Sequence, residues 1–343
     1  MAFYDSLFDR LGLRDWCDAG KTGDGPVSMA DLLARAGVKK EESGFDIPFP
    51  SLDELHKSCG SIGQSRDVTK GVENGFLAIK DVLRFVLDPL TQPLSWLLEF
   101  ALKTTEATPW WIMLPILGLV VFIASKSWRL VAFVLFCLMF LAFVDHYDHA
   151  MQTLAVIYVC AFLCVLLGVP IGIAMSRSDR LQRIIIPVLD MLQTLPPFVY
   201  LIPLIFLFSV TEPKLYGVAI ILYAIVPVIR LTDLGIRLVD KDVIEASNSF
   251  GMTGRQKLFG VQIPLALPNI MAGINQTIMM SLAMVVIASL VSAPGLGVLV
   301  LRGIRNLELG DGLVSGFGIV LLAIILDRVT KAALGRVNAA QKT

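Results

Sequence analysis

The sequence predicts an all-α membrane protein that crosses the bilayer about seven times. Of its 343 residues, 55% are hydrophobic and 17% are charged, and the mean hydropathy is +0.72, values far from those of a soluble domain. Long uncharged runs alternate with short charged loops, and about 20 apolar residues at roughly 1.5 Å each cross a bilayer core of about 30 Å. The net charge is zero, so no overall field favours nucleic-acid binding.

The uncharged runs place the predicted spans in chain order. They lie near residues 109–125, 130–145, 150–174, 190–210, 215–229, 268–291 and 312–327. The uncharged run from Leu258 to Leu301 is too long for one helix, but its prolines divide it into one span with flanks, because proline lacks the N–H that continues a helix. Residues 107–145 therefore hold two accessory spans, and residues 146–330 hold the other five.

Basic residues in the short loops predict the orientation. Lys and Arg gather in the loops after the first, third, fifth and seventh spans, whereas the alternate loops are poor in them. Because Lys and Arg are enriched on the cytoplasmic side, these four loops are predicted to be cytoplasmic. The C-terminal tail, residues 331–343, then lies inside and the N-terminus lies outside.

That orientation makes residues 1–106 an external tail, although the first residues have no apolar signal-peptide core. Residues 85–103 are apolar but contain Asp88 and Pro89, so they predict an amphipathic helix in the membrane interface better than a span. Residues 18–75 are rich in Gly, Ser and charged residues and predict loosely folded chain.

Cysteines and histidines give weak signals. Cys17 and Cys59 would both lie in an oxidising compartment and can pair, but the sequence leaves this open. His146 and His149 flank a polar loop, for which a solvated turn is a better explanation than a metal site. We assign no metal ligands.

Residues 230–267 form a polar island between two spans. Its charges cost roughly 2.5 to 3.5 kcal/mol each at a bilayer centre, so this segment is predicted to lie in water. Asp242 and Glu245 predict the start of a short helix that ends at Gly251. Thr253 and Gln256, three residues apart, predict the start of a second helix. The island therefore reads as helix, turn, helix.

The spacing within this island carries a family resemblance. Glu245-Ala246-Ser247, three residues, Gly251, nine residues and then Val261-x-Ile263-Pro264 resembles the E-A-A loop of binding-protein-dependent ABC transporter permeases. The pattern there is E-A-A, three, G, nine, I-x-L-P, so Ser247, Val261 and Ile263 are mild departures. The resemblance implies a type I ABC importer fold. It also implies that the loop is a coupling helix seated in a cytoplasmic ATPase, with Glu245, Ala246, Ser247, Gly251 and Pro264 as coupling residues.

The likeness extends over about residues 147–330 and is closest to permeases for glycine betaine and proline betaine uptake. It is carried by Leu189–Thr194, Pro197–Leu201, Ile244–Ser247, Ile270–Thr277 and Ala323–Arg328. It implies an ATP-driven importer of quaternary-ammonium compatible solutes that works by alternating access. Choline, carnitine and trimethylamine N-oxide remain alternative substrates.

Polar and aromatic residues inside the spans predict where a solute passes. Prolines interrupt backbone hydrogen bonding in the fourth span beside such residues, and buried polar groups in the sixth span should face other helices or a cavity. An aromatic ring can hold a quaternary ammonium ion, although packing at a kink is the alternative for the rings and interhelical hydrogen bonding for the amides. The candidate path residues are Gln193, Thr194, Phe198, Tyr200, Asn275 and Gln276.

No nucleotide-binding loop of the G-x-x-x-x-G-K-[S/T] type occurs in the sequence. The chain is therefore predicted to be a transport subunit without its own ATPase site or cofactor, and ATP and Mg²⁺ would bind a partner ATPase. The resemblance further implies a periplasmic substrate-binding protein, a second copy of the permease, and the bacterial inner membrane. An osmotically gated channel is the main rival, and an intramembrane enzyme would need a nucleophile and base that the spans lack.

Overall fold

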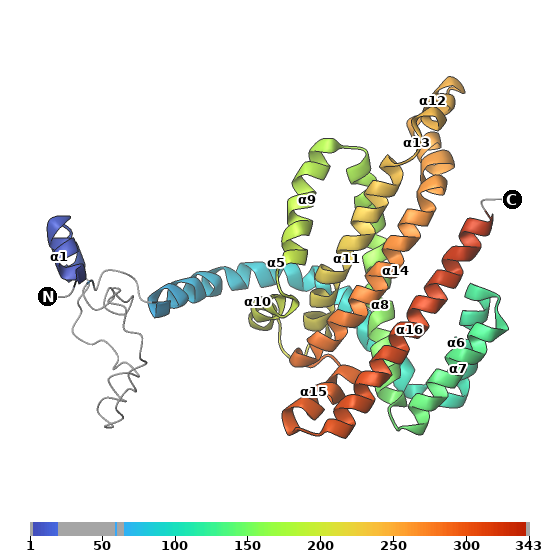
Figure 1. The fold of residues 1–343 in the computed structure, drawn as a ribbon, viewed down its shortest axis with the longest axis horizontal. Coiled ribbons are helices and arrows are strands. Elements are labelled where there is room, and N and C mark those ends of the chain that lie inside the picture. The colour runs from blue at the N-terminus through green and yellow to red at the C-terminus, as the bar shows by residue number, and fades with distance from the viewer. Residues whose placement is uncertain (1–2, 20–58, 60–64, 341–343) are drawn as a thin grey trace. The chain divides into compact units, whose positions relative to one another are not determined.

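A computed structural model of the chain describes residues 3–19, 59 and 65–340, and the regular elements in these ranges are helices (Figure 1). The chain divides into two units, residues 1–81 and residues 82–343. The prediction of an all-helical protein is therefore confirmed for the part that the structure describes.

The first unit contains α1 (Phe3–Arg10) and α2 (Arg14–Ala19). Cys17 forms a disulfide with Cys59, a pairing that the sequence left open. Both cysteines are buried with Phe8 in a small apolar cluster. The loosely folded chain expected over residues 18–75 falls mostly outside the described residues.

The core of the second unit is a bundle of four helices, α8 (Tyr147–Ser176), α11 (Pro213–Arg237), α14 (Ile263–Ala288) and α16 (Leu309–Ala340) (Figure 1). Glycine allows two of them to approach closely. A Cβ added at Gly172 of α8 would lie 2.7 Å from the carbonyl oxygen of Ile229 on α11. Small residues at such contacts are typical of helix packing in membranes, where van der Waals contact replaces the hydrophobic drive.

Four helical segments are long and apolar enough to cross a membrane by themselves: Tyr147–Ser176, Pro213–Arg237, Gly254–Val291 and Leu309–Arg336. Two bent pairs raise the number to six if each pair counts as one span. One pair is Thr69–Ala107 with α6 (Trp110–Ser125), and the other is Asp179–Thr194 with Pro197–Leu207. The helix α7 (Trp128–Phe143) is apolar but shorter. A count of seven spans therefore stays a prediction.

The fourth predicted span, residues 190–210, is interrupted at the prolines where the sequence predicts a break, and its first helix begins earlier than expected. Helix α9 begins at Asp179, ends at Thr194, and is followed by the 3-10 turn η1 (Pro197–Tyr200) and by α10 (Leu201–Leu207). The chain bends by 105° at this break. The physical reason is Pro196, which forces Leu195 out of the helical region to an extended backbone with ψ of 134°.

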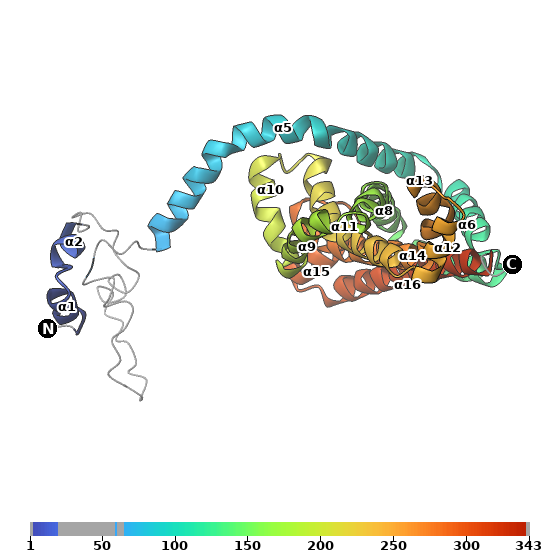
Figure 2. The same ribbon diagram turned by 90° about the horizontal axis from the view of Figure 1, so that it is seen from above.

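Helix α5 (Ser65–Ala107) is longer than the helix expected over residues 85–103. From Val82 onwards it belongs to the second unit and lies along one side of the bundle (Figure 2). A Cβ added at Gly217 of α11 would lie 2.7 Å from a methyl carbon of Leu98, so these two helices pack closely.

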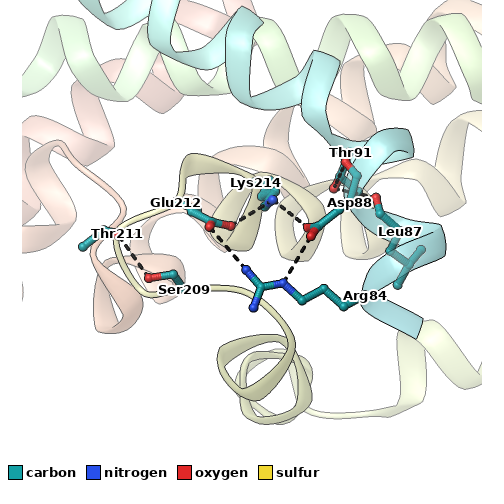
Figure 3. Close-up of polar contacts among 8 residues, drawn as sticks. All are labelled: Arg84, Leu87, Asp88, Thr91, Ser209, Thr211, Glu212 and Lys214. Atoms are coloured by element: carbon teal, nitrogen blue, oxygen red, sulfur yellow. Dashed lines mark hydrogen bonds and ion pairs between the residues drawn. The ribbon is translucent and has the colours of Figure 1, made fainter. Parts of the chain in front are cut away.

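A buried lysine ties α5 to the start of α11 (Figure 3). Nζ of Lys214 lies 2.7 Å from Asp88 and 2.9 Å from Glu212, and the lysine side chain is 6% exposed. Arg84 donates to the other carboxylate oxygen of Asp88 at 3.1 Å and lies 3.9 Å from Glu212. Two cations thus neutralise two carboxylates at this contact.

Candidate functional site

The polar island folds as two short helices, α12 (Lys241–Ser249) and α13 (Gly254–Lys257), joined by a tight turn. They project from one end of the bundle, and α15 (Leu296–Asn306) lies at the opposite end (Figure 1). The predicted order of helix, turn, helix is confirmed.

The start of α12 differs from the expectation. Asp240, and not Asp242, caps the helix, because its carboxylate accepts a hydrogen bond from the backbone N–H of Asp242 at 3.0 Å. A capping residue needs a non-helical backbone, which Asp240 has with ψ of 133°. Asp242 instead lies in the first turn, where its charge favours the positive end of the helix dipole.

Gly251 ends α12 in the left-handed conformation that the sequence predicts, with φ of +71°. Its N–H donates to the carbonyl of Asn248 at 2.9 Å, and the N–H of Met252 donates to that of Ser247 at 3.2 Å. This pair of bonds is the Schellman arrangement, which satisfies the last carbonyls of a helix.

The second helix is held by local contacts. Thr253 and Gln256 form the predicted capping box, in which each side chain accepts from the other residue's backbone N–H. Nζ of Lys257 donates to the side-chain oxygen of Asn248 at 2.9 Å, so the two helices are also joined directly. The turn therefore has a defined shape that is held largely by contacts within the loop.

The predicted coupling residues take different positions on this structure. Glu245 and Ala246 are exposed, whereas Ser247 is 5% exposed and donates from its hydroxyl to the carbonyl of Val243 at 2.7 Å. Phe250, which the sequence reasoning passed over, is 85% exposed beside the turn. Pro264 lies in the first turn of α14.

The chain between the loop and α14 has a wider helical turn. Residues Leu258–Gln262 form a π-helical turn, and the N–H of Ile263 donates to the carbonyl of Leu258. Pro264 follows immediately, and a proline cannot make the usual bond to the carbonyl four residues earlier. The helix that begins in the loop thus continues into α14 through one wider turn.

A network of polar side chains lies where α11 leads into the loop. The guanidinium of Arg237 donates to Asp233 at 2.9 Å, to Asp179 at 2.7 Å, and to the carbonyl of Met175 at 2.9 Å. Asp233 is 5% exposed, and its second oxygen accepts from Gln182 at 2.7 Å. We call these five residues the loop-base network.

Further contacts join the same elements. Arg230 of α11 pairs with Asp190 near the far end of α9. Arg177, at the end of α8, donates to the carbonyl of Gly254 in α13 at 3.4 Å. The sequence reasoning counted these charges as evidence for a watery loop but did not find their partners. The pair of Asp233 and Arg237 could have been found from the sequence, because residues four apart on a helix are neighbours.

Four candidate path residues gather around the break after α9. Gln193, Thr194 and Phe198 are exposed, whereas Tyr200 is buried. The hydroxyl of Tyr200 makes no hydrogen bond within the described residues. A buried hydroxyl without a partner is costly, so this side chain is the best placed of the four to meet a ligand or water.

The two candidates on α14 are placed differently. Asn275 donates to Asp327 of α16 at 3.4 Å and accepts from the hydroxyl of Thr330 on the same helix. Gln276 is exposed. The contacts of Asn275 favour the interhelical hydrogen bonding that the sequence kept as an alternative to a path role.

Known proteins resemble this chain in sequence and fold. Residues 164–341 match the family described as binding-protein-dependent transport system inner membrane component. The chain is 42% identical over 285 residues, 83% of its length, to the glycine betaine/proline betaine transport system permease protein ProW of Escherichia coli, and covers 78% of that protein.

A second relative and one solved structure are similar. The glycine betaine/carnitine transport permease protein GbuB of Listeria monocytogenes is 43% identical over 209 residues, 61% of this chain and 73% of that protein. An inward-facing structure of the MetNI methionine ABC transporter has a TM-score of 0.51 at 19% identity, covering 56% of this chain and 95% of that one. The latter likeness concerns the fold alone.

Proposed function

Because the chain belongs to the family of binding-protein-dependent transport system inner membrane components, it is the permease of an ATP-driven ABC importer, and we propose that its cargo is glycine betaine or a related quaternary-ammonium solute. The observation that carries the cargo is the identity of 42% to a relative named for glycine betaine and proline betaine. Carnitine, choline and trimethylamine N-oxide are the alternative solutes, and another relative is named for carnitine.

The site fits such a cargo in its chemistry. A quaternary ammonium ion donates no hydrogen bonds and is held over electron-rich rings, which Phe198 and Tyr200 supply beside the break in the fourth span. The proposed path comprises these two rings with Gln193, Thr194 and, less directly, Asn275 and Gln276. Affinity for the solute would reside chiefly in a periplasmic binding protein.

We assign α12 and the turn after it to the contact with a cytoplasmic ATPase, which would bind ATP and Mg²⁺. The loop projects from the bundle (Figure 1), has a shape set by its own caps, and exposes Phe250. Glu245, Ala246, Ser247, Gly251 and Pro264 are the proposed coupling residues. A second copy of the permease would complete the path by a two-fold axis.

The proposed orientation puts the N-terminus in the periplasm and the C-terminus in the cytoplasm. The loop charges support it through the enrichment of Lys and Arg on the cytoplasmic side. The Cys17–Cys59 disulfide also supports it, because disulfides persist in oxidising compartments. Exposed apolar side chains on α5, among them Phe85 and Trp96, suit a helix in the interface at the periplasmic face of the inner membrane.

The test is reconstitution of the permease with its ATPase and binding protein in vesicles, followed by uptake of labelled glycine betaine. We expect uptake that requires ATP, the ATPase and the binding protein, and that competes with proline betaine. Betaine flux that continues at the same rate without ATP would instead favour an osmotically gated channel. ATP-dependent uptake of a different solute would keep the importer and remove the proposed cargo.

A further inference from the structure

We propose that α9 and α11 move as one rigid body, and that Arg237 is the positioning residue through which movement of the coupling loop reaches the break in the fourth span. The inference rests on the proposed function of the loop as the contact with an ATPase. It concerns residues that the sequence reasoning did not assign to any role.

Arg237 lies at the junction between α11 and the loop. It is the last residue of α11, and Asp240, three residues later, caps α12. Its guanidinium joins α11 to the end of α8 and to the first residue of α9 through Met175 and Asp179. A displacement of α12 therefore reaches, within three residues, a side chain that also holds the corner between α8 and α9.

The contact between α9 and α11 at this end contains a buried carboxylate. Asp233 is 5% exposed and accepts from both Arg237 and Gln182, so its two oxygens are each hydrogen-bonded. Separation of α9 from α11 would leave Arg237 on Asp233 but would remove the donor Gln182 from the second oxygen of this buried carboxylate and Asp179 from the guanidinium, which disfavours separation. The network thus resists sliding at this end.

Contacts between α9 and α11 continue along the rest of α9. Apolar side chains at helical spacing, Leu181, Ile185 and Leu189, belong to one cluster with Val226 and Ile229 of α11. Beyond them, Asp190 pairs with Arg230. Polar contacts at both ends with an apolar face between them hold the two helices along their shared length.

The far end of α9 leads into the segment that holds the candidate path residues. Helix α9 has 16 residues and ends at Thr194, where the chain bends by 105° into η1 and α10. At roughly 1.5 Å per residue its length is about 24 Å, so a tilt of about 10° about the loop-base network displaces its far end by about 4 Å. The buried Tyr200 ends the turn η1 that follows this bend.

The first experiment measures coupling in the reconstituted complex of permease, ATPase and binding protein. We expect Arg237→Gln to raise the ATP hydrolysed per solute transported about tenfold over wild type, a ratio within the usual range of coupling energies. Asp179→Asn, which weakens a largely exposed ion pair, should raise the same ratio by a smaller factor, about two to five. The ATPase should still co-purify, and Arg237→Lys, which keeps the charge but not all three hydrogen bonds, should restore part of the coupling. Asp179 is 77% exposed, so its variant is expected to fold even if that of Arg237 does not.

The matched control is Lys331→Gln, which removes an ion pair with Asp327 on α16, outside the loop-base network, and should leave the ratio unchanged. A normal ratio in Asp179→Asn and in well-folded Arg237→Gln would overturn the proposal. Loss of ATPase binding in both variants would also overturn it, because the network would then shape the docking surface and not transmit movement.

The second experiment does not depend on the identity of the cargo. Spin labels on cysteines at Ile184 of α9 and Leu234 of α11, both exposed, report the distance between the two helices. A second pair, Ile184 with the exposed Phe317 of α16, reports movement of α9 and α11 relative to α16. We expect ATP binding to change the second distance and not the first. A change in the first, or no change in either, contradicts the rigid body.

Discussion

Replacing Gly251 with valine tests whether the shape of the turn after α12 matters for coupling. The residue has φ of +71°, and a Cβ built there meets nothing within 4 Å. The cost of a side chain is therefore conformational and not steric. For a residue with a Cβ the left-handed conformation costs about 1 to 2 kcal/mol, and a β-branched residue lies at or beyond the upper end.

That cost sets the expected size of the effect. Because about 1.4 kcal/mol corresponds to a factor of ten in an equilibrium constant, Gly251→Val should reduce the equilibrium constant for the native turn by roughly tenfold or more, and the apparent affinity for the ATPase by up to the same factor. Gly251→Ala should lie between valine and wild type. Gly251→Asn should stay near wild type, since asparagine tolerates this conformation.

The assay is titration of the purified permease with its ATPase, together with ATP-dependent uptake in vesicles. Membrane insertion and thermal stability of the bundle should be unchanged, because the turn is held by contacts within the loop. Equal affinity and uptake for glycine, asparagine and valine at this position would refute the reasoning. So would a loss that is as large for asparagine as for valine.

Three other changes follow from the same structure. Lys214→Met should lower the unfolding free energy by about 1 to 3 kcal/mol, because Asp88 and Glu212 lose a buried cation but remain partly screened by water. The measurement is the thermal midpoint in detergent, with Lys331→Met as the control. Asn275→Ala should lower the same thermal midpoint with little change in the KM for betaine uptake. Phe198→Ala should raise that KM with little loss of stability. A raised KM for Asn275→Ala would instead place Asn275 in the path. Cys17 should react with a thiol reagent after reduction and not before, as a gel shift shows, and reaction in untreated membranes would contradict the disulfide.

Local features of the loop were predictable because their causes lie within a few residues. The capping box of Thr253 needs a residue three positions on, and the left-handed turn needs a glycine after a helix, so both are visible in sequence. The cap of α12 was misplaced by two residues, because Asp240 and Asp242 are both suitable and the end of α11 decides between them. The bend after α9 was visible as a proline pair, but its angle was not.

Composition and periodicity by themselves determined that this chain is a helical membrane protein with a water-exposed loop, because the bilayer imposes that pattern on any sequence that crosses it. Only the tertiary structure decided which charges meet. Asp179 and Gln182 lie more than 50 residues from their partners on α11, and Asp88 lies 126 residues from Lys214. Such pairs depend on how helices dock, which is set by packing over the whole bundle and leaves no mark at either residue alone.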